Sequence, residues 1–128
     1  MSEMSNFLED ALTNQIFRGI TMTAIPTVYA GLYTAAPSDS GGGTEVSGNG
    51  YARVSVAFGA PSNGQVLNSG TVTFATATAS WGTITHFGIF DTTTSGNLLV
   101  WTPLDTSKAI GTNDVAQFAA SAISVTFD

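Results

Sequence analysis

The most informative segment of the chain is Trp81-Gly-Thr-Ile-Thr-His-Phe-Gly-Ile-Phe-Asp91. Its residues alternate with a period of two, so odd and even positions are expected on opposite faces of a β-sheet. Both sets contain large apolar side chains, which indicates that protein covers both faces of this strand. Gly82 and Gly88 leave room for a backbone or an aromatic ring to lie close. The segment therefore predicts a structural strand rather than a reactive site.

Short apolar segments of the same kind follow Thr27 and are separated by turn signals such as Asn63-Gly64. Their spacing of roughly 8–12 residues is typical of a single antiparallel β-sandwich, Ig-like or jelly-roll-like, and a barrel variant stays open. The expected strands, about seven or eight in number, are 28–33, 51–58, 65–68, 71–75, 81–90, 98–102, 116–119 and 123–127.

One N-terminal α-helix is expected over about residues 5–18. Its apolar stripe consists of Leu8, Leu12 and Ile16. Asn6 followed by Glu9 resembles a capping box, with Ser5 as a rival N-cap, and Gly19 is a suitable C-terminal stop. The helix either packs across the sheet or reaches a neighbouring subunit.

The composition favours one domain, residues 1–128, that works inside an assembly. Charged residues make up 9 % of the chain, against about 25 % in a typical soluble domain. Weakly charged surfaces resist association poorly. Residues 37–50 contain five glycines and Val46 as the one bulky apolar residue, so a long flexible loop is expected there.

The net charge of −6, with only Arg18, Arg53 and Lys108 as basic residues, argues against several partners. A basic patch for nucleic acid is missing, and so is a basic amphipathic segment for anionic membranes. No apolar run approaches the ~20 residues of a membrane span, and the N-terminus lacks the pattern of a signal peptide. The absence of cysteine excludes disulfides and thiolate metal sites. No cofactor is expected.

Any catalytic hypothesis has to begin at His86, the only histidine. No nucleophile-elbow motif accompanies it, so we expect a strand histidine that hydrogen-bonds to a loop or to a subunit neighbour. Asp39 and Glu45 come nearest to a calcium loop, but they are only two ligands, and solvated loop acids are favoured. The glycines at 41–43 lack the lysine and the following helix of a P-loop.

Five aromatic residues are compatible with a carbohydrate-stacking platform: Tyr29, Tyr33, Tyr51, Trp81 and Trp101. Tyr29 and Tyr33 share one strand face. Because tyrosine and tryptophan are also enriched at protein interfaces, an interface is favoured over a sugar site. Arg53 is expected to pair with a carboxylate, with a pair across a subunit boundary as one option.

Several blocks of the sequence resemble small virion proteins of tailed bacteriophages. They are the segments 28–39, 43–54, 81–91, 96–99 and 107–111, which together span nearly the whole chain. Members of this family are commonly labelled tail-fibre proteins, and related small β proteins serve as capsid decoration (cement) proteins. The resemblance implies a non-enzymatic virion component that forms a homo-oligomer, with a trimer favoured.

The leading functional expectation is a capsid decoration protein that binds the major capsid protein on the outer lattice and stabilises the head. Multivalent attachment of one oligomer would raise its avidity by about 10²–10⁴ over a single contact. The alternative is a tail-fibre or tail-tip module that contacts other tail proteins and binds a host-surface glycan. Candidate interface residues are Leu8, Leu12, Ile16, Tyr29, Tyr33, Tyr51, Arg53 and His86.

Overall fold

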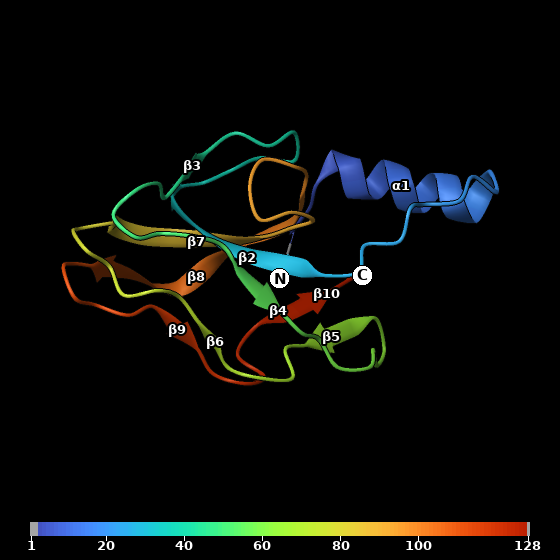
Figure 1. Cartoon of the computed structure of the whole chain (residues 1–128). Coiled ribbons are helices and arrows are strands. Elements are labelled where there is room, and N and C mark those ends of the chain that lie inside the picture. Colours follow the sequence, from blue (N-terminus) through green and yellow to red (C-terminus); the bar gives the residue numbers. More distant parts are fainter. Residues whose placement is uncertain (1–2, 128) are drawn as a thin grey trace.

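The computed structural model describes residues 3–127, and these form a mainly β fold with one helix (Figure 1). The elements are β1 (Glu3–Met4), α1 (Asn6–Phe17), β2 (Val28–Ala35), β3 (Thr44–Glu45), β4 (Val54–Val56), β5 (Gln65–Leu67), β6 (Val72–Thr73), β7 (Gly82–Phe90), β8 (Leu98–Ile110), β9 (Gln117–Phe118) and β10 (Ser124–Thr126). Every strand pair is antiparallel. The predicted fold class is confirmed.

The main layer is a six-stranded sheet with the order β1-β8-β7-β2-β3, in which β4 also pairs with β2. Strand β7 lies between β8 and β2, and Gly88 stands opposite Gly31 of β2 and Trp101 of β8. The odd and the even positions of β7 both contain apolar side chains, which suits a strand in the interior of a sheet that is covered on both faces. The segment at 81–91 is therefore the structural centre of the sheet, as its pattern predicts.

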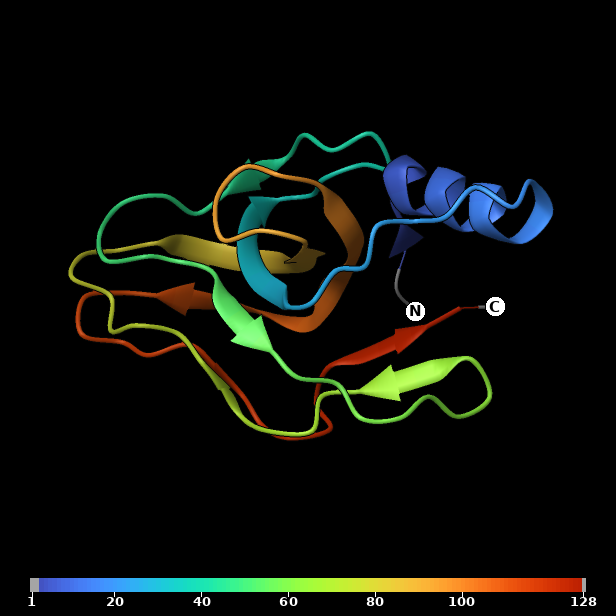
Figure 2. The ribbon, with the colours of Figure 1, turned by 45° about the vertical axis from the view of Figure 1, so that its right-hand side comes forward.

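The second layer consists of two short ladders, β5 with β10 and β6 with β9, which lie together on one side of the main sheet (Figures 1 and 2). The core between the layers includes the fully buried side chains of Leu32, Phe74, Ile84 and Ile123. Buried Asn68 joins the two ladders, because its side-chain amide donates to the carbonyls of Gly70 and Ala119 and its carbonyl oxygen accepts from the N–H of Ile123. The sandwich is thus completed by two ladders rather than one continuous second sheet.

A second apolar cluster covers the opposite face of the main sheet. It consists of Tyr33, Phe90 and Leu98, with Trp101 packed against them. The Tyr33 and Phe90 rings stack at a centroid distance of 6.1 Å. A Cβ on Gly88 would lie 2.7 Å from Leu98 Cδ1 and 3.1 Å from Tyr33 Cε2. Glycine is therefore needed at this position because rings and methyl groups occupy the space beside it.

Helix α1 begins and ends close to the predicted bounds, but its N-cap is Ser5 rather than Asn6. The Ser5 hydroxyl accepts a hydrogen bond from the Leu8 N–H at 3.3 Å and donates to the Leu98 carbonyl. The Ser5 N–H also binds the Leu99 carbonyl at 2.8 Å, so the start of the helix is fixed to β8. Gly19 follows the C-cap with a φ of +65°, the left-handed conformation expected of a helix stop.

Each of the eight predicted strands overlaps an observed one, and the differences lie in loops and strand ends. Strand β3 lies inside the segment 37–50, which was predicted to be an unstructured loop. The short strand β1 was not predicted. Strand β8 continues to Ile110, whereas the predicted strand ends at residue 102. The prediction ended too early because a wide bulge interrupts the alternation of side chains beyond that point.

Candidate functional site

Arg53, Glu45 and Tyr51 form a hydrogen-bonded cluster at the sheet edge, where β3 and β4 both pair with β2. Arg53 donates from Nε to Glu45 Oε2 at 2.8 Å and from Nη2 to Glu45 Oε1 at 2.7 Å. The Tyr51 hydroxyl donates to Glu45 Oε2 at 2.7 Å and accepts from the Leu32 N–H at 2.9 Å. The hydroxyl therefore occupies the gap between β3 and β4 and satisfies a backbone donor of β2.

Arg53 is held from every side by groups of its own chain. Its guanidinium carbon lies 3.4 Å from the centroid of the Phe90 ring, a cation–π contact. Its Nη1 donates to the carbonyls of Thr92 and Ser95 at 3.0 and 2.8 Å. The sequence predicted a carboxylate partner and left a cross-subunit pair open; the observed partner is Glu45 of the same chain. Glu45 is accordingly not the solvated loop acid that was expected.

The cluster fixes the protonation states of its members. Burial raises the pKa of Tyr33 to about 12, and the charge of Glu45 acts in the same direction. Burial and the hydrogen bond to Glu45 raise the pKa of Tyr51 far above its ordinary value. Burial opposes the charge on Arg53, but the hydrogen bonds and charge of Glu45 raise its pKa overall. At neutral pH both tyrosines stay neutral and Arg53 stays charged, which suits a structural clamp.

The five aromatic residues considered for a sugar platform do not form one exposed surface. Tyr33 and Trp81 are 4 % and 5 % exposed. The Tyr51 ring packs between Phe74 and Trp81 in the core, with the Trp81 ring edge-on at 5.4 Å. Tyr33 belongs instead to the outer cluster. Tyr29 and Tyr33 share one strand face, but other side chains of the same chain cover Tyr33. The described residues therefore form no continuous aromatic platform.

His86 is half-buried on the outer face of β7 and opposite Tyr33 of β2. Its Nδ1 lies 2.8 Å from the hydroxyl of Thr85, and its ring centroid lies 6.0 Å from that of Trp101. Within the described chain its hydrogen-bonding partner is thus the hydroxyl of the preceding residue and not a loop, which was one of the two partners expected from the sequence. The role of His86 at a subunit interface stays a prediction.

Helix α1 projects beyond the sheet toward one end of the molecule, together with the returning segment 18–27 (Figures 1 and 2). Of the predicted stripe, Leu8 is buried and Leu12 packs against the core, but Ile16 is 70 % exposed. Phe17 beside it is 80 % exposed. Three exposed apolar residues lie at the C-terminal end of α1 and just after it, and they are referred to below as the α1 tip: Ile16, Phe17 and Ile20.

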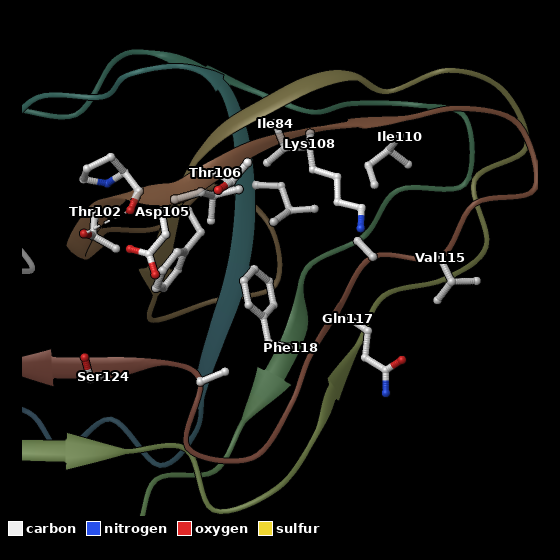
Figure 3. A pocket seen from close by; sticks show the side chains of 16 residues that line it. Ile84, Thr102, Asp105, Thr106, Lys108, Ile110, Val115, Gln117, Phe118 and Ser124 are labelled. Carbon is white, nitrogen blue, oxygen red and sulfur yellow. Dashed lines mark hydrogen bonds between the residues drawn. The ribbon is translucent and has the colours of Figure 1, made fainter.

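A cavity of about 640 Å³ lies between β8 and the segment that carries β9 (Figure 3). Its apolar lining includes Ile84, Phe87 and Phe118, and the Phe118 ring points toward β8. Asp105 and Lys108 project into the same space from β8. These residues come from three separate strands and enclose a mixed apolar and charged site. This space is called the β8–β9 cavity below.

The wide bulge in β8 presents the charged residues of the β8–β9 cavity. Pro103 stands opposite His86 and Lys108 stands opposite Ile84, so residues 104–107 have no partner in β7. Bulges redirect side chains and are frequent beside functional sites. Sequence reasoning did not identify this site. Its only local signal is the polar run from Asp105 to Lys108 within a strand, and the cavity itself depends on segments far apart in the chain.

The described residues give no support to a metal or membrane site. Within residues 3–127 no group of three or more histidine, aspartate or glutamate side chains could hold a metal ion. Asp39 and Glu45 therefore do not form part of such a group. Over the same residues, no helix has the length and hydrophobicity that crossing a lipid bilayer requires.

Comparison with known families gives one match, which covers nearly the whole chain. Residues 3–126 match the family model described as "Podophage GP4 fiber I protein gp80". No curated protein matches the chain. The resemblance to small tailed-phage virion proteins, first seen in the blocks of the sequence, is confirmed.

Proposed function

The chain belongs to the family of the podophage GP4 fiber I protein gp80, and we propose that it is a structural subunit of a virion fibre that acts by associating with further copies of itself. The family is one of phage fibre proteins, so a place in the virion follows from membership. Self-association, with a homotrimer favoured, is the further step. The observation that carries this step is the α1 tip.

The α1 tip is apolar surface that the chain itself leaves uncovered. Ile16 and Phe17 are 70 % and 80 % exposed on a helix that projects from the sheet. Covering apolar area releases about 25 cal/mol per Å², and clustered exposed apolar side chains are typical of contact surfaces. None of the three side chains of the α1 tip is charged, so the contact would bury no charge at its centre. The α1 tip is therefore the proposed subunit contact.

The interior of the domain is suited to a mechanical role. Arg53, Glu45 and Tyr51 hold the segment 37–50 and the loop after β7 against the sheet through side-chain hydrogen bonds. His86, the residue from which any catalytic hypothesis began, has a threonine hydroxyl and a tryptophan ring as its neighbours. We propose that the protein is not an enzyme and that its rigid sheet carries the contact surfaces.

The capsid decoration function expected from the sequence fits the family description less well than a fibre position does. Binding of the major capsid protein stays a prediction. The decisive experiment is gold labelling of intact particles with antibody fragments against this chain, followed by electron microscopy. We expect label on fibres that project from the particle. Label spread evenly over the shell in hundreds of copies would replace the fibre proposal with decoration, and its absence from purified particles would refute both.

A further inference from the structure

The β8–β9 cavity has a size and chemistry that the proposed fibre function does not explain. Its volume of about 640 Å³ lies in the range of roughly 300–1,000 Å³ that is typical of small-ligand sites. We propose that this cavity binds one or two neutral pyranose units of an oligosaccharide. The proposal deepens the fibre function and rests on it in one respect, namely that a fibre brings the cavity to a cell surface.

The floor of the cavity provides the apolar contact that a sugar ring requires. Phe118 is half-buried and points into the space (Figure 3). Its ring packs against those of Phe87 and Phe74, at centroid distances of 5.6 and 6.4 Å. A pyranose ring has one face made of C–H groups, which can pack on such a supported aromatic ring. This arrangement replaces the tyrosine and tryptophan platform, whose members are dispersed.

The rim supplies hydrogen-bonding groups that nothing in the described chain uses. Asp105 and Lys108 are exposed, and neither side chain has an ion-pair or hydrogen-bond partner among residues 3–127. The ionised Asp105 carboxylate accepts hydrogen bonds and the Lys108 ammonium donates them. Sugar hydroxyls both donate and accept, so they can satisfy the two groups together. A few polar groups around an apolar floor are the usual composition of a ligand site.

A neutral sugar fits this rim better than the other occupants do. A segment of a second copy would have to cover a carboxylate and an ammonium that have no partner, and charged residues are depleted at the centres of protein interfaces. An anionic polysaccharide or a nucleic acid would face Asp105 and a net charge of −6. The α1 tip, by contrast, carries no such charges and remains the surface proposed for subunit contact.

The test is binding of the full chain to a printed array of bacterial surface oligosaccharides, with neutral and anionic O-polysaccharide and peptidoglycan fragments as separate arms. We expect retention on the neutral O-polysaccharide fragments and none on the anionic ones, and the peptidoglycan arm shows whether cell-wall glycan is bound as well. Asp105→Asn and Lys108→Met should each weaken binding about tenfold or more, the usual effect of losing a hydrogen bond to a charged group. The control is Asp39→Asn, which makes the same charge change at an exposed acid outside the cavity.

Three outcomes would overturn the sugar proposal. They are no retention on any neutral fragment, retention that Asp105→Asn leaves unchanged, and amide-exchange protection of residues 105–108 by subunit association alone, which would identify a second copy as the occupant.

Phe118→Ala is a less suitable test because Phe118 also packs against the core. Particle incorporation of Asp105→Asn separates the two proposals, since we expect it to equal that of the wild type. If sugar binding fails but incorporation into particles is normal, the sugar proposal is refuted and the fibre proposal is not.

Discussion

The guanidinium of Arg53 and the carboxylate of Glu45 meet through two parallel hydrogen bonds, Nε to Oε2 at 2.8 Å and Nη2 to Oε1 at 2.7 Å. Paired, planar hydrogen bonds of this kind are among the stronger polar contacts in proteins. The side chains are 7 % and 24 % exposed, so solvent screens the pair only in part. The pair ties β3 to the segment before β4 and thereby closes the sheet edge beside β2.

Arg53→Ala should lower the free energy of unfolding by about 2–3 kcal/mol, because it leaves the Glu45 carboxylate at a partly buried site without its cationic partner. Urea denaturation measures this loss. Arg18→Ala is the control, since Arg18 is exposed and bonds only to Asn14 of its own helix, and a change within about 0.5 kcal/mol is expected. Sedimentation should give the same mass for Arg53→Ala and the wild type. A lower mass would mean that Arg53 also supports a contact between subunits.

Gly88→Ala should destabilise the fold by about 1–3 kcal/mol, the usual cost of overpacking a filled site. The added methyl group would meet Leu98 Cδ1 at 2.7 Å and the Tyr33 ring at 3.1 Å, and both side chains are buried. Gly70→Ala is the matched control because no atom lies within 4 Å of its added Cβ. Thermal denaturation of the two variants should separate them clearly. Equal melting temperatures would show that the outer cluster repacks freely.

The stability of the wild type should fall as the pH rises from about 10 to 12. The pKa of Tyr33 is about 12 in the folded chain, against 10.0 for an ordinary tyrosine. In this interval the folded state retains a proton that the unfolded state releases, so the slope of stability against pH is negative. Two pKa units correspond to about 2–3 kcal/mol as an upper value. Tyr33→Phe should match the wild type below pH 9 and lose less stability above pH 10. Parallel curves would contradict this assignment.

Replacing Ile16 and Phe17 together by serine should weaken self-association without unfolding the sheet. Both side chains are largely exposed, so the change removes little packing within one chain but removes apolar area from the proposed contact. Sedimentation velocity should show a shift to lower mass, and circular dichroism should retain its β-rich form. Thr13→Ser, another exposed change on α1, should leave the mass unaltered. An unchanged mass in the double variant would exclude the α1 tip as the contact.

The strands could be predicted where alternation is local and uninterrupted, as in β7 and β2. Strand β3 escaped detection because its residues Thr44 and Glu45 are polar and follow three glycines. Its pairing depends on Arg53, which lies outside the segment that was assigned as a loop. The helix was located by its apolar stripe, but nothing local indicates that Ile16 faces outward, since this follows from the direction in which α1 leaves the sheet.

The β8–β9 cavity lay outside the reach of sequence reasoning for a different reason. Asp105 lies within the bulge and Lys108 directly follows it, and the size of this bulge is visible only from the pairing of β8 with β7. Phe118 reaches the same cavity from a two-residue strand. Periodicity identifies the faces of one strand, whereas this site depends on how two layers are spaced. The aromatic residues that appeared suited to sugar binding serve the two apolar clusters.

The contact between Ser5 and the carbonyl of Leu98 joins positions that are 93 residues apart. During translation the Ser5 side chain therefore has no partner in the sheet until β8 has left the ribosome. Until then a short amphipathic segment is marginally helical on its own, and loop closure over such a span slows folding. The contact of α1 with β8 consequently forms only after β8 has been made, and until then the helix is free to contact nascent chains on neighbouring ribosomes.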